Sequence, residues 1–326
     1  MAVMNMIESI RATLAAEMQR DERIILLGQD IGGNGGMFRA TDGLQRRFGE
    51  ERVVDMPLAE GVIVGAAVGL ACSGLRPIPE LQFLGFGSQA FHQVEGQVAR
   101  MRFRSQGRYP MAITIRAPFG GNVRTPELHS DAQEAKYVHS PGLKVAMPAS
   151  AHDAKGLLSE AIRGEDPVLF CEPLRGYRLI KDEVPDEDYT IPFGRLRVVR
   201  EGSDVTLVAW SAAVVVAQTA AELAAEEGIS CKVVDLRTLV PLDSEGLREA
   251  VSSTGRAVVI HEAPLTAGFG AEVVATIMEE AFWSLTAPVL RVAAPDTPYP
   301  IAALEELYIP SAERALVTIK RVMDRS

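Results

Sequence analysis

The chain has 326 residues, of which 47% are hydrophobic and 23% are charged, and its formal net charge at pH 7 is −10. This length favours two domains of about 150 residues each, and the composition is typical of a globular protein. The negative charge argues against nucleic acid or an anionic membrane surface as a partner.

The three cysteines lie in apolar segments and show no CxxC spacing. This pattern excludes a disulfide framework and a zinc ribbon, and it fits a reducing compartment. The longest nearly apolar runs, residues 61–72 and 205–217, are shorter than the roughly 18–20 residues that span a bilayer. No secretory signal is apparent at the start of the sequence. We therefore expect a cytoplasmic protein that has no membrane partner.

Apolar runs and helical patterns alternate through the first half of the chain. Met6, Ile10 and Leu14 recur at helical spacing, which predicts a helix over residues 4–20. Strands are expected next at 23–28, 52–54, 76–83, 109–117, 143–148 and 167–172. The helices between them are expected at 41–48, 61–72, 87–104, 132–139 and 151–163. This alternation predicts an α/β fold, in which a parallel sheet is covered by helices on both faces.

Residues 179–194 change character, because the run from Lys181 to Asp188 is charged and lacks an apolar period. We interpret them as an exposed linker between a first domain, residues 1–178, and a second domain, residues 195–326. The alternation then restarts. Strands are expected at 204–210, 231–236, 256–261 and 289–293, and helices at 214–227, 244–253, 270–282 and 311–323.

One stretch of the first half combines a strand end, a proline and a carboxylate. The strand 52–54 ends at Asp55, Pro57 breaks it, and Glu60 opens the Gly/Ala/Val-rich segment 61–72. Desolvation at the mouth of such an apolar unit would raise the pKa of Glu60 and let it hold a proton near neutral pH. The same carboxylate could instead only complement the helix dipole. The spacing alone leaves both interpretations open.

Several familiar motifs are missing from the sequence. The glycine clusters lack the third glycine of a dinucleotide fingerprint, and no GxxxxGK[ST] loop or Gly-x-Ser-x-Gly elbow occurs. Of the five histidines, His129 lies in the Gly- and Pro-containing loop 118–131 that follows a predicted strand. Such loops hold ligands in α/β sheets, although a solvated loop histidine fits the pattern as well. His139 follows without a third ligand nearby, so no zinc site is expected.

Several long motifs occur in an order shared with one protein family. They are Asp55-Met56-Pro57-Leu58-Ala59-Glu60, Glu80-Leu81-Gln82-Phe83, His129-Ser130, His139-Ser140-Pro141-Gly142-Leu143-Lys144-Val145, Asp235-Leu236-Arg237-Thr238 and Asp296-Thr297-Pro298-Tyr299-Pro300. Over nearly its whole length the chain resembles the β subunit of the thiamine-diphosphate-dependent E1 component of 2-oxo acid dehydrogenase complexes. The resemblance implies an N-terminal parallel-sheet domain that binds the aminopyrimidine of thiamine diphosphate. It also implies a smaller α/β domain of the transketolase C-terminal type.

The resemblance assigns roles to particular residues. Glu60 matches the family glutamate that hydrogen-bonds the pyrimidine ring and so assists removal of the thiazolium proton. Phe86 is placed against the same ring, and Leu58 and Gln89 are expected near the cofactor. His129 matches the active-site histidine, which resembles a proton donor to the bound intermediate and a guide for lipoyl acylation.

The resemblance also implies a structural potassium ion, held by backbone carbonyls and one carboxylate. The matching positions are Ile113, Ala161, Ile162, Gly164 and Asp166. The family signature for Mg²⁺ and diphosphate, Gly-Asp-Gly followed by an Asn pair, is absent from this sequence. The resemblance therefore implies that an α subunit holds Mg²⁺ and the diphosphate, in an α2β2 heterotetramer.

The implied activity is oxidative decarboxylation of a 2-oxo acid, either pyruvate or a branched-chain acid, with acyl transfer to lipoamide on an E2 core. The alternatives are an acetoin dehydrogenase, a split transketolase-like subunit and a non-catalytic assembly subunit. The sequence departs from the family at Gln29, His92, Asn122–Leu128 and Leu174. These departures lie near the expected cofactor or substrate funnel and leave the substrate open.

Overall fold

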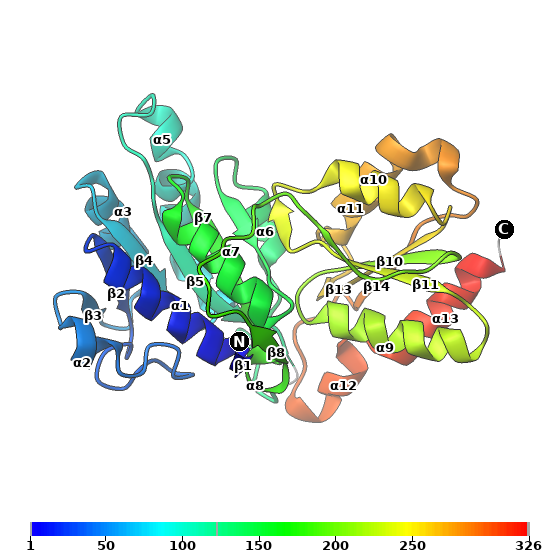
Figure 1. Ribbon diagram of the computed structural model, residues 1–326, viewed down its shortest axis with the longest axis horizontal. Coiled ribbons are helices and arrows are strands. Elements are labelled where there is room, and N and C mark those ends of the chain that lie inside the picture. The colour runs from blue at the N-terminus through cyan, green and yellow to red at the C-terminus, as the bar shows by residue number, and fades with distance from the viewer. Residues whose placement is uncertain (1, 122, 325–326) are drawn as a thin grey trace.

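The computed structural model describes residues 2–121 and 123–324, and it contains two large sheets (Figure 1). The first has the strand order β12 (Thr238–Val240), β6 (Lys144–Ala146), β7 (Val168–Pro173), β5 (Thr114–Phe119), β4 (Arg76–Glu80), β2 (Ile24–Gly28) and β3 (Val53–Asp55). The second has the order β14 (Leu290–Ala294), β13 (Ala257–Pro264), β10 (Val205–Ala209), β11 (Cys231–Asp235) and β9 (Arg197–Arg200). Only the edge strands β12 and β9 pair antiparallel within these sheets, among the described residues. The predicted α/β class is confirmed.

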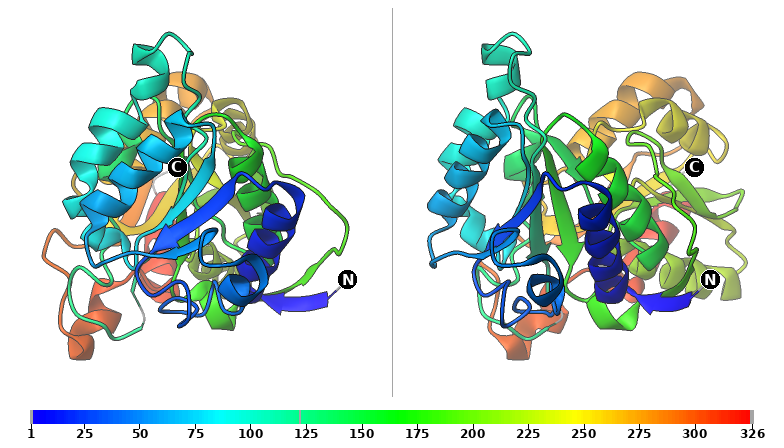
Figure 2. Two further views of the ribbon diagram at one scale, coloured as in Figure 1. Left: turned by 90° about the vertical axis from the view of Figure 1, so that its left-hand side faces the viewer. Right: turned by 60° about the vertical axis from the view of Figure 1, so that its left-hand side comes forward.

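Helices cover both faces of the first sheet. On one face, α1 (Met6–Arg20) packs against α7 (Ala151–Arg163). On the other face lie α3 (Glu60–Cys72) and the helical segments of residues 84–104 (Figure 2). Successive residues of β2 alternate between these two layers. Strands that are buried on both faces read as continuous apolar runs, and this is why the sequence predicts them well.

The single helix predicted at 87–104 is wrong. The structure has four short segments there: η1 (Leu84–Gln89), α4 (Phe91–Gln93), η2 (Val94–Val98) and α5 (Met101–Arg104). η1 is a tight 3₁₀ helix that packs closely against α6 (Glu134–Val138), since a Cβ on Gly87 would lie 2.2 Å from the Tyr137 hydroxyl. η2 is a π-helical turn. Tertiary packing here overrides a local pattern that favours one continuous helix.

The ends of the first half also differ from prediction. Residues Ala2–Asn5 form β1, which pairs antiparallel with β8 (Lys181–Val184), so α1 begins only at Met6. Because β8 lies within the segment predicted as an irregular linker, that prediction is wrong for these residues. Val184 is buried. A short helix, α8 (Gly176–Leu179), precedes β8.

Helix α2 (Leu44–Phe48) is shorter than the helix predicted at residues 41–48. It begins after Gly43, and no side chain makes a capping hydrogen bond. Thr41, where the predicted helix begins, lies before α2 and donates its hydroxyl hydrogen to the Ile31 carbonyl at 2.7 Å. The Thr41 side chain is therefore tied to the Ile31 loop, and it makes no hydrogen bond to the first turn of α2.

The second sheet is likewise covered on both faces (Figure 1). One face carries α9 (Ala213–Glu226) and α13 (Ala312–Met323), and the other carries α10 (Ser244–Ser252) and α11 (Gly270–Ala281). Short helical turns complete this half: η3 (Phe282–Ser284), η4 (Ala302–Leu304) and α12 (Glu305–Tyr308). No helix in residues 2–121 and 123–324 combines the length and the apolar character needed to cross a membrane.

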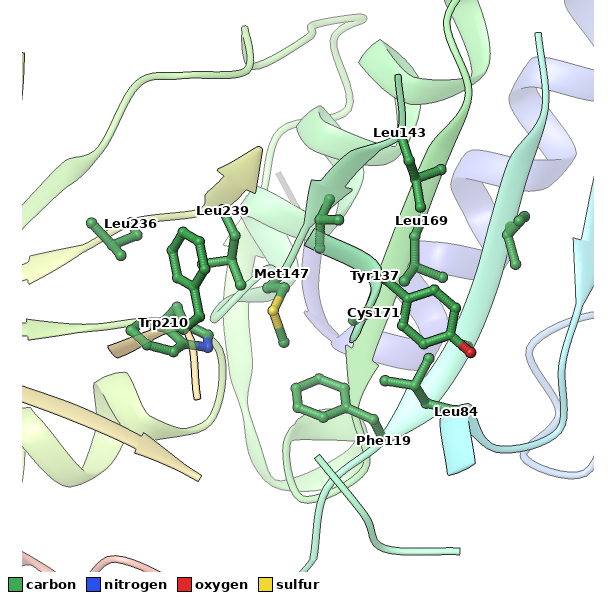
Figure 3. Packing of buried hydrophobic residues seen from close by; sticks show 14 of the residues in the cluster. Leu84, Phe119, Tyr137, Leu143, Met147, Leu169, Cys171, Trp210, Leu236 and Leu239 are labelled. Atoms are coloured by element: carbon green, nitrogen blue, oxygen red, sulfur yellow. The ribbon is translucent and has the colours of Figure 1, made fainter. Parts of the chain in front are cut away.

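One buried apolar cluster runs through both halves of the molecule. Trp210 and Leu239, from the second half of the chain, lie beside Met147 and Phe119 from the first half (Figure 3). β12, which the sequence did not predict, extends the first sheet although it follows β11 in the chain. The two halves therefore share a core, which fixes the loops at their boundary relative to each other.

Candidate active site

Glu60 is the first residue of α3, and its side chain is buried. Only 7% of the residue is exposed, and its carboxylate has no hydrogen-bond or ion-pair partner among the described residues. The carboxylate oxygens of Glu60 are not among the fully buried atoms that lack a partner, so they remain open to a ligand that can hydrogen-bond them. The position at a helix N-terminus favours negative charge but does not satisfy this carboxylate. The arrangement therefore fits a ligand that brings its own hydrogen-bonding nitrogen atoms, as an aminopyrimidine ring does.

The other residues predicted near the cofactor surround this end of α3 in different environments. The end of η1 lies against α3, since a Cβ on Gly61 would lie 3.2 Å from the Gln89 carbonyl oxygen. Phe86 is half-buried on η1, whereas Gln89 is exposed. Leu58 is 71% exposed. An apolar side chain this exposed beside a buried carboxylate is available to contact a ligand or a second chain.

His129 lies in an aromatic cluster with Phe86. Its ring centroid is 4.7 Å from that of Phe83 and 4.8 Å from that of Phe86, in edge-to-face arrangements, and the two phenylalanines are 5.5 Å apart. The structure thus brings together His129 and Phe86, which are far apart in the sequence. Because η1 carries Phe86 and contacts the start of α3, it links the surroundings of Glu60 to those of His129.

Backbone geometry shapes the loop of residues 120–131, here called the His129 loop. A Cβ on Gly85 would lie 2.0 Å from the Leu128 carbonyl oxygen, so only glycine allows η1 and this loop to approach so closely. Leu128 itself has a positive φ of 66°. The neighbouring Ser130 hydroxyl bonds Thr125 Oγ1 at 2.6 Å. Asn122, one of the departures from the family, lies outside the described residues.

One hydrogen bond determines which nitrogen of the His129 ring carries the hydrogen. Nδ1 lies 3.3 Å from the Glu127 carbonyl oxygen. A carbonyl oxygen can only accept, so Nδ1 carries the hydrogen in this contact and Nε2 is left with a lone pair. Among the described residues, no side chain makes a hydrogen bond to this histidine. Its position therefore depends on the two phenylalanines and on the backbone of the loop.

A buried charged network that the sequence analysis missed lies at the same end of the first sheet. Arg116 on β5 donates from Nη1 to Glu80 Oε2 at 2.6 Å and from Nε to Glu172 Oε1 at 2.6 Å. Glu172 on β7 also accepts from the Tyr177 hydroxyl. Burial raises the pKa of Glu80 and, well above its usual value, the pKa of Tyr177. Burial opposes ionisation of Arg116 too, but the two carboxylates raise its pKa overall.

This network is joined to the aromatic cluster through the ring of Phe38. The ring of Phe38 lies 5.3 Å from that of Tyr177 and 5.5 Å from that of Phe83, which in turn contacts His129. The signal in the sequence was a charged residue within or at the end of each of three strands: Glu80, Arg116 and Glu172. Such residues are expensive to bury unless they pair with one another.

The residues predicted to hold potassium carry other partners in the structure. Arg76 Nη1 donates to the Ile162 carbonyl at 2.8 Å and to the Gly164 carbonyl at 2.7 Å. Asp166 pairs with Lys144 at 2.9 Å and also with Arg102. The two remaining positions add only their carbonyls, and that of Ile113 accepts a hydrogen from Val168. As arranged here, the set does not fit a free oxygen cage for K⁺, because protein cations already face the oxygens of Ile162, Gly164 and Asp166.

The other departures from the family lie outside this cluster or in its walls. Leu174 is buried, Gln29 is half-buried and His92 is exposed. A cavity of about 1410 Å³ lies between the two halves and is lined by α6, α11 and residues 263–269, with His139 at its wall. Glu127 and Leu128 line it, whereas Glu60 and His129 do not. Among the described residues, no group of three or more His, Cys, Asp or Glu side chains is placed to hold a metal ion.

Comparison with known proteins identifies relatives of both halves. The family "Transketolase, pyrimidine binding domain" matches residues 2–178, and "Transketolase, C-terminal domain" matches residues 194–315. The protein named pyruvate dehydrogenase E1 component subunit beta from Bacillus subtilis (strain 168) is 48% identical over 324 residues, covering 99% of this chain and 100% of that protein. The proteins of the same name from Staphylococcus epidermidis and Staphylococcus aureus are 48% and 46% identical over the same lengths.

Two solved structures share the fold. A split-gene transketolase, described as an inactive β4 tetramer, superposes with a TM-score of 0.82 at 25% identity and covers 99% of both chains. A transketolase mutant from Pichia stipitis gives a TM-score of 0.71 at 15% identity. That match covers 99% of this chain and 46% of the transketolase chain. Both similarities describe the arrangement of helices and strands.

Proposed function

Because this chain belongs to the family of β subunits of the thiamine-diphosphate-dependent E1 component of 2-oxo acid dehydrogenase complexes, we propose that it provides the pyrimidine half of a pyruvate dehydrogenase active site. The proposed reaction is oxidative decarboxylation of pyruvate: CO₂ leaves, and the remaining acyl group is transferred to a lipoamide disulfide, which is reduced. The observation that carries the proposal is the carboxylate of Glu60 at the start of α3, on a residue that is only 7% exposed and that has no hydrogen-bond or ion-pair partner among the described residues.

Glu60 would hold the pyrimidine end of the cofactor. When bound, thiamine diphosphate supplies a carbon nucleophile and an electron sink for the charge left by departing CO₂. A protonated Glu60 Oε can donate a hydrogen bond to a ring nitrogen and favour the tautomer whose exocyclic nitrogen accepts a proton. Since Glu60 has no protein partner among the described residues, this bond would replace none that exists. Phe86, and with less contact Leu58 and Gln89, would line the same side of the ring.

His129 would act on the substrate side of the site. Its Nδ1–H is taken by the Glu127 carbonyl, so Nε2 is the atom that can accept or deliver a proton. The edges of Phe83 and Phe86 hold the ring and limit its rotation. A positioned imidazole of this kind suits general acid–base work near neutral pH.

We further propose that a separate α subunit completes the site in an α2β2 heterotetramer and binds the diphosphate through Mg²⁺. Leu58 precedes Glu60 by two positions and is 71% exposed, and Val62 follows Glu60 by two positions and is 54% exposed. Apolar side chains exposed beside a buried polar site are typical of an interface. The relatives are themselves named as subunits of a larger component. Docking to an E2 lipoyl acyltransferase core belongs to the same proposal.

The names of the relatives favour pyruvate over branched-chain 2-oxo acids or acetoin. The similarity to a split-gene transketolase favours one alternative, a subunit that transfers two-carbon units between sugars. The two functions differ in the acceptor: a pyruvate dehydrogenase subunit needs a lipoyl disulfide, whereas a transketolase-type subunit needs an aldose phosphate.

A substrate panel tests the proposal. The chain is co-expressed with its candidate α subunit, and the purified complex is assayed with thiamine diphosphate and Mg²⁺. Substrates are pyruvate, 3-methyl-2-oxobutanoate, acetoin and xylulose 5-phosphate, each with a lipoyl domain or ribose 5-phosphate as acceptor. We expect CO₂ release and acyl-lipoyl formation to be fastest with pyruvate, and neither with the β chain alone. Turnover that needs ribose 5-phosphate, or full activity of the β chain alone, would refute the proposal.

A further inference from the structure

The His129 loop is held from across the domain boundary. Gly121 N–H donates to Glu262 Oε1, and Glu262 lies on β13 of the second sheet. The backbone approaches this carboxylate closely, since a Cβ on Gly120 would lie 3.0 Å from Glu262 Oε2. Gly120 has a φ of +87°, a conformation that favours glycine. The first turn of the loop is therefore built to meet a carboxylate from the other half of the chain.

A second carboxylate holds the loop further along. Arg124 N–H donates to Glu305 Oε1 at 3.3 Å, and Glu305 is the first residue of α12. Glu305 is only 2% exposed, and the Tyr299 hydroxyl donates to the same oxygen at 2.5 Å. Tyr299 also packs on the loop, because a Cβ on Gly121 would lie 1.8 Å from its hydroxyl oxygen. Tyr299 thus fixes the carboxylate and contacts the backbone that the carboxylates hold.

These contacts matter because His129 has little else to hold it. Among the described residues its ring makes one hydrogen bond, to the Glu127 carbonyl within the same loop, and it packs against the rings of Phe83 and Phe86. Any displacement of the loop backbone would move the imidazole by a similar amount. A shift of about 1 Å in an active site can cost roughly 10²-fold in rate.

We propose that Glu262 and Glu305 are positioning residues for His129, and that the second domain sets the geometry of the active-site loop through them. Neither residue touches the reacting atoms. Each acts by accepting a backbone N–H of the loop, so an acceptor oxygen matters and the charge does not. The activity part of this proposal rests on the function proposed above, whereas the structural part does not.

Proteolysis tests the structural part without cofactor or partner. Arg124 is exposed and precedes Thr125, so trypsin can cut there once the loop opens. Glu262→Ala, Glu305→Ala and the double variant should be cut after Arg124 at least about tenfold faster than the unaltered chain. Glu262→Gln and Glu305→Gln keep an acceptor oxygen and should stay within about threefold of it. Glu279→Ala, which removes an exposed carboxylate on α11, is the matched control.

Hydrogen exchange of the unaltered chain covers the case in which the alanine variants fail to fold. The amides of Gly121 and Arg124 should exchange at least about tenfold more slowly than that of Val123, whose N–H has no partner among the described residues. Equal exchange of the three amides would overturn the proposal. So would trypsin cleavage of folded alanine variants at the rate of the unaltered chain.

The assembled enzyme separates this proposal from the proposed function. With pyruvate as substrate, Glu262→Ala and Glu305→Ala should lower kcat about tenfold or more and change KM less, with recovery in the glutamine variants. If the loop opens in proteolysis while kcat is unchanged, the loop is held as proposed but His129 has no role in turnover. If the loop does not open, the positioning role itself is wrong.

Discussion

Replacing Arg116 tests whether the buried network beneath the aromatic cluster holds this end of the sheet. The side chain is 1% exposed and makes three hydrogen bonds to two carboxylates, at 2.6, 2.6 and 2.9 Å. In Arg116→Met both Glu80 and Glu172 lose their cation and stay buried. Breaking a buried pair in this way costs about 3–5 kcal/mol. For a domain of this size that corresponds to a fall in Tm of roughly 6–20 °C.

The assay is thermal unfolding followed by circular dichroism, with Arg100→Met as the matched control. Arg100 pairs with Glu95 at 2.8 Å, but its side chain is 51% exposed, so its loss should cost only about 0.2–1 kcal/mol. The deficit of Arg116→Met should shrink at pH 5, since Glu80, whose pKa is raised by burial, can then be buried as a neutral acid. Equal losses of Tm in the two variants would refute the reasoning.

Three further outcomes are expected. Burial, and then the nearby Asp153, raises the pKa of Asp235 from 3.8 to about 7, so the folded state binds this proton more tightly and loses stability as the pH rises from 4 through 7. Asp235→Asn should therefore raise Tm at pH 8 and hardly change it at pH 5. An equal gain in Tm at both pH values would contradict this. Gly85→Ala should lower pyruvate turnover about tenfold or more, because the added Cβ would displace the His129 loop. Gly69→Ala is the control and should leave turnover unchanged, since a Cβ there meets nothing within 4 Å. Equal turnover in both variants would exclude the close approach of Gly85 to Leu128. Exchanging KCl for choline chloride should change Tm by no more than about 1 °C, because Arg76 occupies the carbonyls of Ile162 and Gly164. A stabilisation specific to K⁺ would show that the ion displaces the Arg76 side chain from these carbonyls.

The layered fold could be predicted from the sequence because its signals are local. Buried parallel strands read as apolar runs, and α3 reads as a Gly/Ala/Val-rich helix that begins where Glu60 places a carboxylate. The edge strands β9 and β12 could not be found in this way. Both are short, and β12 owes its existence to a partner in the other half of the chain, at β6. The pairing of β1 with β8 was missed for the same reason.

The site was predicted in part. The loop position of His129 at the end of a strand indicated a ligand-binding edge, and the structure places it against Phe86. Its supports could not be read from the sequence, because Glu262 and Glu305 lie more than a hundred positions away and meet the loop only through tertiary packing. The resemblance that supplied the potassium positions does not reveal that Arg76 faces two of their carbonyls. Distant side chains that compete for one set of oxygens leave no local pattern.

The role of Glu60 is tested most directly by Glu60→Gln in the reconstituted complex with its α subunit. Decarboxylation of pyruvate is measured at saturating thiamine diphosphate, with the exposed Glu51→Gln as the control. Glutamine keeps the size of the side chain but cannot exchange a proton with a pyrimidine nitrogen. The account predicts a loss in kcat of about 10²-fold or more for Glu60→Gln and none for Glu51→Gln. A loss of less than about threefold would contradict it.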